Sequence, residues 1–254
     1  MRPSRFRALS LSIALSLATL TAAHAESAPP KAAPVGGLSI SPLAQTLAPS
    51  QKSGQMVISN ANSKPVTLQV FVDKWTTAGP GDRELTEAEQ KERCQSGKHD
   101  NQMLTPTTEI RFAPSVMTLK PGATQTVRYI MTAPEGAPEQ AYRVCVKELP
   151  SPEALAQAQG RVIITTSMIF PWIWRAADAK PQLSSHWSQG DLVVKNEGTA
   201  TAQLVNLQAG SVSKHGLQGY VLPGETHTFK LGVKAPVGQV QTKVNGHEET
   251  LDVQ

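Results

Sequence analysis

The 254-residue sequence is poor in the residues that build catalytic and metal sites. It has only two cysteines, far apart, and its six histidines share no close ligand spacing. An HExxH pair, a GxSxG turn and a glycine-rich phosphate loop are all missing. We therefore expect no bound zinc, no nucleotide and no cofactor, and we predict that the protein is not an enzyme.

The sequence also lacks a large excess of basic residues. It contains 24 Lys and Arg against 20 Asp and Glu, and three of the arginines lie in the first 25 residues, which contain no acid. The rest of the chain has 21 − 20, a net charge of +1. Nucleic-acid binding, which needs a clustered basic patch, is not expected.

Long apolar runs are missing except for residues 8–22, ALSLSIALSLATLTA. This run follows the basic start MRPSRFR and precedes Ala23-His24-Ala25, so residues 1–25 resemble a cleaved secretory signal peptide. The alternative is a membrane anchor, but the run is short for a span of about 20 residues. Residues 26–37, rich in Pro, Ala and Gly, are expected to be a flexible leader.

The two cysteines, Cys94 and Cys145, would meet an oxidising compartment after export. A disulfide between them is the expected state. It would close a loop of about 50 residues and contribute on the order of 4 kcal/mol in the chain-entropy treatment. Two unpaired thiols, with Cys145 buried in a strand, are the alternative.

Short alternating segments separated by turn residues fill most of the chain, which favours β-sandwiches. Asn60–Ser63 predicts a turn, Lys120–Ala123 fits a type II turn, and Asn245-Gly246 is a strong hairpin signal. We expect an all-β protein with a first domain at 38–176 and a small second β-sandwich at 177–254, joined by a hinge near 176–183.

Two segments interrupt this pattern. Residues 82–102 are highly charged and are interpreted as a surface insertion between strands. Residues 151–160, SPEALAQAQG, predict either a helical turn capped by Ser151 or a mobile loop.

Residues 160–175, GRVIITTSMIFPWIWR, do not alternate as a strand with one wet face should. No charge lies between Arg161 and Arg175, and both parities carry large apolar side chains. A central strand buried between two sheets would give this pattern. A strand that packs on its own domain with one face and on a guest with the other would give it too.

Several stretches resemble the periplasmic chaperones of chaperone–usher pili. They are VISNANSKPVTLQVFVDKW, LTP at 104–106, the run PxxxxLxPGxxQxVR at Pro114–Arg128, YRxxxxELP at Tyr142–Pro150, and GYVLPGETHTF near the end. Together they span most of residues 38–230, and the sequence looks closest to the archaic branch of the family. The resemblance implies two immunoglobulin-like domains in a boomerang arrangement.

The resemblance also implies a role for the apolar run near residue 165. In the family, the last strand of the first domain completes the unfinished fold of a pilus subunit by β-strand addition. Carried over residue by residue, the donor side chains are Val162, Ile164, Thr166, Met168 and Phe170. The opposite parity, Ile163, Thr165, Ser167 and Ile169, would then face the domain's own core.

The sequence departs from better-studied relatives at their carboxylate anchor. Pro171 falls near the strand position where those relatives have a basic residue, and no arginine lies between Leu38 and Asn60. Arg128, Arg111 and Arg143 are candidate anchors by charge alone. For each of them, an ordinary exposed or salt-bridged arginine is the favoured interpretation.

We thus expect a periplasmic, ATP-independent assembly chaperone whose partners are pilus subunits and an outer-membrane usher, and whose free form can self-associate. A secreted structural or adhesive immunoglobulin-like module, similar to a pilus subunit, is the alternative. The segment ESAPPKAAPVGG lacks the alternation that such a subunit's N-terminal extension should have.

Overall fold

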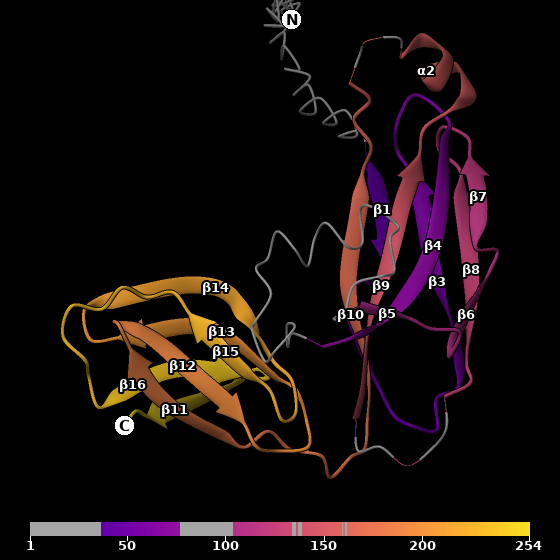
Figure 1. Cartoon of the computed structure of the whole chain (residues 1–254). Helices are drawn as coiled ribbons and strands as arrows, with labels where there is room; N and C mark the ends of the chain where they lie inside the picture. Colours follow the sequence, from indigo (N-terminus) through magenta and orange to yellow (C-terminus); the bar gives the residue numbers. More distant parts are fainter. Residues whose placement is uncertain (1–36, 77–103, 134–135, 137–138, 159, 161) are drawn as a thin grey trace, which may run out of the picture. The chain divides into compact units, whose positions relative to one another are not determined.

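The computed structural model describes residues 37–76, 104–133, 136, 139–158, 160 and 162–254, which form strands and one short helix (Figure 1). The residues from Val35 to Gln254 form one compact unit. Within it, two separate hydrophobic clusters lie in two β-sandwich domains, one on each side of residues 176–182. The prediction of an all-β protein with two sandwiches is confirmed.

The first domain packs two sheets face to face. Sheet A has the order β1 (Leu38–Ser41), β3 (Ser53–Asn60), β8 (Thr124–Met131) and β6 (Ile110–Ala113). Sheet B has the order β2 (Gln45–Leu47), β10 (Ser167–Arg175), β9 (Glu139–Leu149), β4 (Val66–Trp75) and β5 (Leu104–Pro106), and β7 (Val116–Leu119) also pairs with β4.

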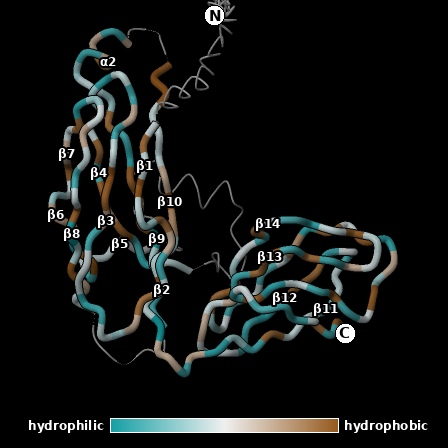
Figure 2. Tube along the Cα trace, turned by 180° about the vertical axis from the view of Figure 1, so that it is seen from behind, coloured by the Kyte–Doolittle hydropathy of each residue, from teal (hydrophilic) through white to brown (hydrophobic). Residues whose placement is uncertain are grey.

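Alternation along the strands builds the core of this domain, and hydrophobic and hydrophilic positions alternate along many strands in Figure 2. In β3 and β8 every second residue is buried, including Met56 and Val127. Trp172 of β10 lies among these residues, 4.7 Å from the ring centre of Tyr129, and its Nε1 donates to the Leu43 carbonyl at 2.8 Å. An aromatic edge-to-face cluster therefore joins β10 to sheet A.

The second domain has two smaller sheets. One has the order β11 (Leu183–Ser188), β12 (Asp191–Asn196), β15 (Thr226–Phe229). The other has the order β14 (Val212–Val221), β13 (Ala202–Ala209), β16 (Gln239–Val244), β17 (His247–Asp252). Its core is mostly aliphatic and includes the buried Phe229. The buried Asn196 donates its side-chain amide to the carbonyls of Ala200 and Val221.

Two of the predicted turns, Lys120–Ala123 and Asn245-Gly246, are confirmed. Ala123 N–H donates to the Lys120 carbonyl at 3.0 Å, and Gly122 has a φ of 72°, as a type II turn requires. Asn245 and Gly246 both have positive φ between β16 and β17, the geometry of a type I′ hairpin.

Of the two readings of residues 151–160, the helix is confirmed, since α2 spans Pro152–Gln157 with the Ser151 side chain accepting from Ala154 N–H. The predicted signal peptide, most of the leader, the 82–102 insertion and Cys94 lie outside the described residues. Cys145 is buried in β9, and its pairing with Cys94 stays a prediction.

Candidate binding strand of the first domain

β10 changes its neighbours along its length. From Trp172 to Trp174 it lies between β9 on one edge and β2 on the other. From Ser167 to Pro171 it pairs with β9 alone, so its other edge is unpaired in the part of the chain that the structure describes. Residues 162–165, which lead into β10, pair with neither neighbour. Among the described residues, the number of free backbone edges thus rises from none at Trp172–Trp174 to one at Ser167–Pro171 and to two at residues 162–165.

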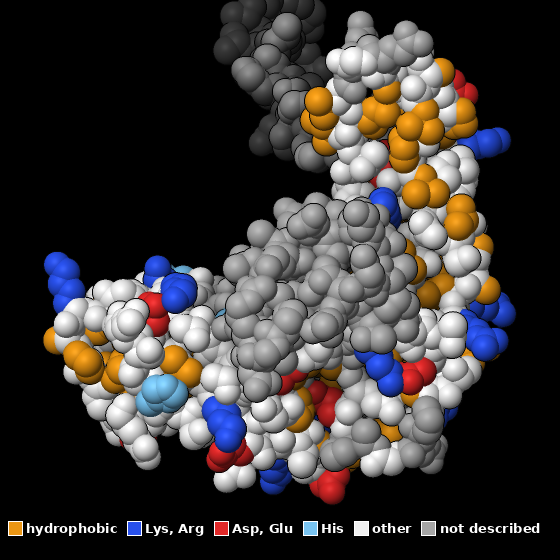
Figure 3. Space-filling model, viewed as in Figure 1, with side chains coloured by type: hydrophobic (Ala, Val, Ile, Leu, Met, Phe, Trp, Pro, Cys, Tyr) orange, Lys and Arg blue, Asp and Glu red, His pale blue; other side chains and the backbone are white. Residues whose placement is uncertain are grey.

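Most side chains of the leading segment are exposed, and only Ile163 among residues 162–166 is half-buried. Val162 and Ile164 are both 90% exposed, the highest values among the large hydrophobic residues described. The segment leading into β10 is coloured as strongly hydrophobic in Figure 2, and hydrophobic side chains also gather over the α2 end of the first domain in Figure 3. Exposed apolar side chains next to unpaired strand edges are a typical site for strand addition by a partner.

The predicted assignment of the two parities was wrong within β10 itself. Phe170 is 4% exposed and belongs to the domain's own core, together with Trp172 and Trp174, and Met168 packs against the same cluster. Ser167 and Ile169 lie on the other face and are half-buried. The even residues face inward because β10 is a regular member of sheet B, and the aromatic cluster with Tyr129 fixes that face.

The predicted donor residues therefore divide into two groups. Val162, Ile164 and Thr166 are exposed, whereas Met168 and Phe170 contribute to the first domain's own core. Farther along β10, the odd parity finds another partner, because Ile173 packs with Trp75 and with Leu222 of the second domain. The second apolar face of β10 is in that part a domain contact.

The three candidate anchor arginines do not come together. Arg111 of β6 and Arg128 of β8 lie in sheet A, and neither side chain has a hydrogen bond or ion pair with a described residue. Arg143 of β9 lies in sheet B, with its guanidinium carbon 3.7 Å from the ring centre of Trp75 and 5.9 Å from that of Tyr220. Burial lowers the pKa of Arg143 to about 10. Arg143 is thus part of a cation–π contact.

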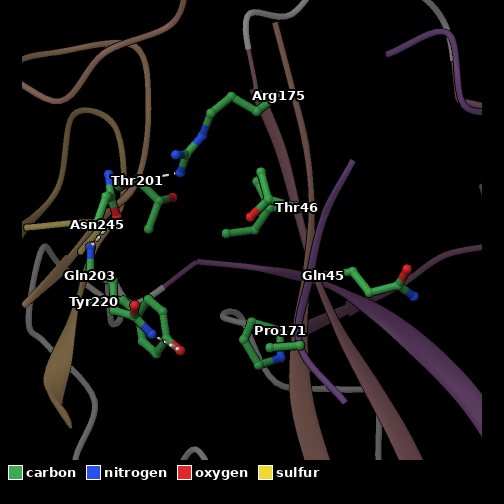
Figure 4. A pocket seen from close by; sticks show the side chains of 10 residues that line it. Gln45, Thr46, Pro171, Arg175, Thr201, Gln203, Tyr220 and Asn245 are labelled. Carbon is green, nitrogen blue, oxygen red and sulfur yellow. Dashed lines mark hydrogen bonds between the residues drawn. The ribbon is translucent and has the colours of Figure 1, made fainter. Parts of the chain in front are cut away.

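A pocket of about 360 Å³ lies beside β10, between β2 and the second domain (Figure 4). Arg175 is the charged residue that lines it, and in Figure 4 it extends toward Thr201, whose carbonyl accepts from Arg175 Nη2 at 2.8 Å. Arg175 Nε donates to Glu139 at 2.6 Å, and the Glu139 side chain is only 2% exposed. The buried carboxylate compensates the guanidinium charge, so the pocket has no free cation for an anionic ligand.

Glu139 and Arg175 were not predicted from the sequence. Glu139 also accepts from the backbone N–H of Thr201, so this pair connects β9 and β10 of the first domain to the second. The one sequence signal was that Arg175 ends a long uncharged run, which marks a charge next to a buried strand.

Other kinds of site are not found in the described part of the chain. No group of three or more His, Cys, Asp and Glu residues there is placed to hold a metal ion. Among the same residues, no helix is long and apolar enough to cross a membrane.

The first of the two sandwiches thus has a last strand whose edge is partly open among the described residues. The family model of the pili and flagellar-assembly chaperones, PapD N-terminal domain, matches residues 37–179, more than half of the chain. The protein belongs to this family. No curated protein sequence matches the chain.

Solved structures of pilus chaperones have the same fold. A chain of the CsuC–CsuE chaperone–tip subunit pre-assembly complex from the archaic Csu pili of Acinetobacter baumannii is 20% identical, with a TM-score of 0.61 and coverage of 86% of this chain and 98% of that one. A chain of the Salmonella enterica SafA pilin–SafB chaperone complex is 15% identical, with a TM-score of 0.57 and coverage of 85% and 95%. The Pseudomonas aeruginosa CupB2 chaperone is 15% identical, with a TM-score of 0.52 and coverage of 82% and 96%.

Proposed function

We propose that the protein is a periplasmic chaperone of the archaic chaperone–usher branch, which captures pilus subunits by donor-strand complementation. It would hold each subunit one to one and deliver it to an outer-membrane usher, without ATP and without catalysis. The observation that carries this proposal is the segment 162–166, which has two apolar side chains that are each 90% exposed. The backbone of residues 162–165 pairs with no described strand.

The physical basis is the burial that only a partner can provide. A Val or Ile side chain contributes about 1.5–3 kcal/mol when it moves from water into a packed core. Val162 and Ile164 lie two residues apart and so project to the same side of an extended strand. Family membership favours this chaperone role over a secreted adhesive module, because pilus chaperones act on subunits.

The test is capture of fimbrial subunits encoded beside the chaperone, co-expressed with it and co-purified. Ile164→Asp should abolish capture, because a carboxylate cannot enter an apolar groove. Leu217→Asp is the matched control, since Leu217 is 55% exposed on β14 of the second domain. This variant should capture subunits as the wild type does. Both variants should fold, as neither side chain belongs to a core.

Capture by Ile164→Asp at the wild-type level would refute donor-strand complementation by this segment. Loss of capture in both variants would show a general surface effect and would also count against it. The same purified protein tests export, since its mass should correspond to a chain that begins at Glu26. Sedimentation of the free protein tests self-association through the open edge of β10.

A further inference from the structure

The pairing of β9 with β10 ends at Glu148. The Glu148 N–H donates to the Thr166 carbonyl at 2.8 Å, so these two residues form a hydrogen-bonded pair of the antiparallel ladder. In a regular pair the Thr166 N–H would donate back to the Glu148 carbonyl. Instead it donates to the Glu148 carboxylate oxygen Oε2 at 3.1 Å. At the end of the ladder, the Glu148 carboxylate has thus replaced the Glu148 backbone carbonyl as the acceptor for the Thr166 N–H.

The ladder cannot continue regularly beyond this pair. Two residues farther along, the next hydrogen-bonded pair would join Pro150 to Ile164. Proline has no N–H and so cannot donate to the Ile164 carbonyl. Glu148 and Pro150 together therefore end the pairing at the point where the two exposed apolar side chains begin.

The point at which β9–β10 pairing ends decides which residues can pair with a guest on both backbone edges. A strand that fills a gap between two strands of a guest needs both of its backbone edges free. Residues 162–165 meet that condition, whereas Ser167–Pro171 keep one edge on β9. A segment that is free on both edges loses conformational freedom when it binds. It loses less if its base is already held in place, so binding then costs less free energy.

We propose that Glu148 is a positioning residue that fixes the base of the donor segment, so that Val162 and Ile164 project freely while Thr166 stays tied to β9. The inference rests on the proposed function. A charged acceptor makes a stronger hydrogen bond than a neutral carbonyl. The half-buried Glu148 lies on β9, the central neighbour of β10, and so provides a rigid support.

Amide hydrogen exchange on the free, full mature protein tests the positioning without a ligand. In the wild type the Thr166 amide should be protected, and the Thr165 and Ile164 amides should exchange rapidly. Glu148→Ala should lower Thr166 protection at least tenfold while Met168 and Phe170 stay protected. Glu148→Gln keeps an acceptor oxygen and should retain most of the protection; Glu153→Ala on α2 is the control for loss of a nearby acid.

Protection of Thr166 that is equal in Glu148→Ala and the wild type would overturn the proposal. So would protection of Ile164 in the wild type, a result that needs no variant.

Capture of the co-expressed subunits supplies the functional readout. Glu148→Ala should capture subunits several-fold more slowly than the wild type, and Glu148→Gln should restore the rate. If the wild type captures subunits and Glu148→Ala matches it, the positioning role is wrong and the chaperone function stands. If the wild type captures none while the exchange pattern is as expected, the proposed function is wrong and the role of Glu148 in the free chain stands.

Discussion

Residues 162–166 and Trp172–Trp174 belong to one apolar run, yet they have opposite surroundings. Val162 and Ile164 are 90% exposed, whereas Trp172 and Trp174 are at most 3% exposed. The second group lies between β9 and β2 and packs on Tyr129. In the first group only Thr166 is hydrogen-bonded to β9, and residues 162–165 pair with no described strand. The difference shows that hydrophobicity marks a residue for burial, while the neighbouring strands decide whether its own chain or a partner provides it.

The largest expected effect concerns the buried end of this comparison. Trp172→Ala should destabilise the first domain by about 3–5 kcal/mol, because it leaves a cavity and removes the indole contact with Leu43. Val162→Ala should change the free energy of unfolding by no more than about 0.5 kcal/mol. Urea denaturation measures both. Equal losses would show that residue 162 is buried in the free protein.

Loss of the predicted disulfide should weaken the attachment of β10 to β9. Cys145 pairs in register with Ile169, so a Cys94–Cys145 bond would support the strand that holds β10. Cys94→Ser should cost up to about 4 kcal/mol. In the wild type, a thiol reagent should label no cysteine before reduction. Labelling of the unreduced, folded protein would contradict the disulfide.

Removal of Arg175 tests whether the last residue of β10 only connects the domains. Arg175→Met should destabilise the protein by about 3 kcal/mol, because it leaves the nearly buried Glu139 carboxylate without its cation. The double variant Arg175→Met with Glu139→Gln should recover part of that loss. Capture per folded molecule should persist, since residues 162–166 are unchanged. A double variant no more stable than Arg175→Met would show that the charge pair is not the cause.

The smallest effect should come from the second domain. The pKa of Asp191 is lowered by its hydrogen bond with Lys230, and the carboxylate also accepts from the backbone of Leu231 and Gly232. Because the pKa of this carboxyl is lower in the folded than in the unfolded state, the ionised group stabilises the fold fully at a pH above its unfolded pKa. That stabilisation is lost as the pH falls through the folded pKa. Solvent screens the exposed Lys230, so Asp191→Asn should cost at most roughly 1 kcal/mol at neutral pH and less in acid.

The measurement for Asp191→Asn is urea denaturation at neutral pH and again below the usual carboxyl pKa of 3.8. A difference from the wild type that does not shrink in acid would contradict the role of the carboxylate. Capture by this variant should match the wild type, which would confine subunit binding to the first domain.

The local features of the fold were predictable from the sequence because they depend on few neighbouring residues. The turns at Lys120–Ala123 and Asn245-Gly246 follow from glycine and asparagine in conformations with positive φ. The strands of both sandwiches follow from alternation, and the family follows from motifs in the first domain.

The sequence determined that residues 162–174 would form an apolar run without charge. Which of its side chains belong to the protein's own core was decided only by the tertiary structure, because that depends on where β2 and β9 end along β10. The contacts of Glu139 and Glu148 likewise join residues far apart in sequence, and no local pattern encodes them. Strand edges are created by pairing, and pairing is a property of the folded chain.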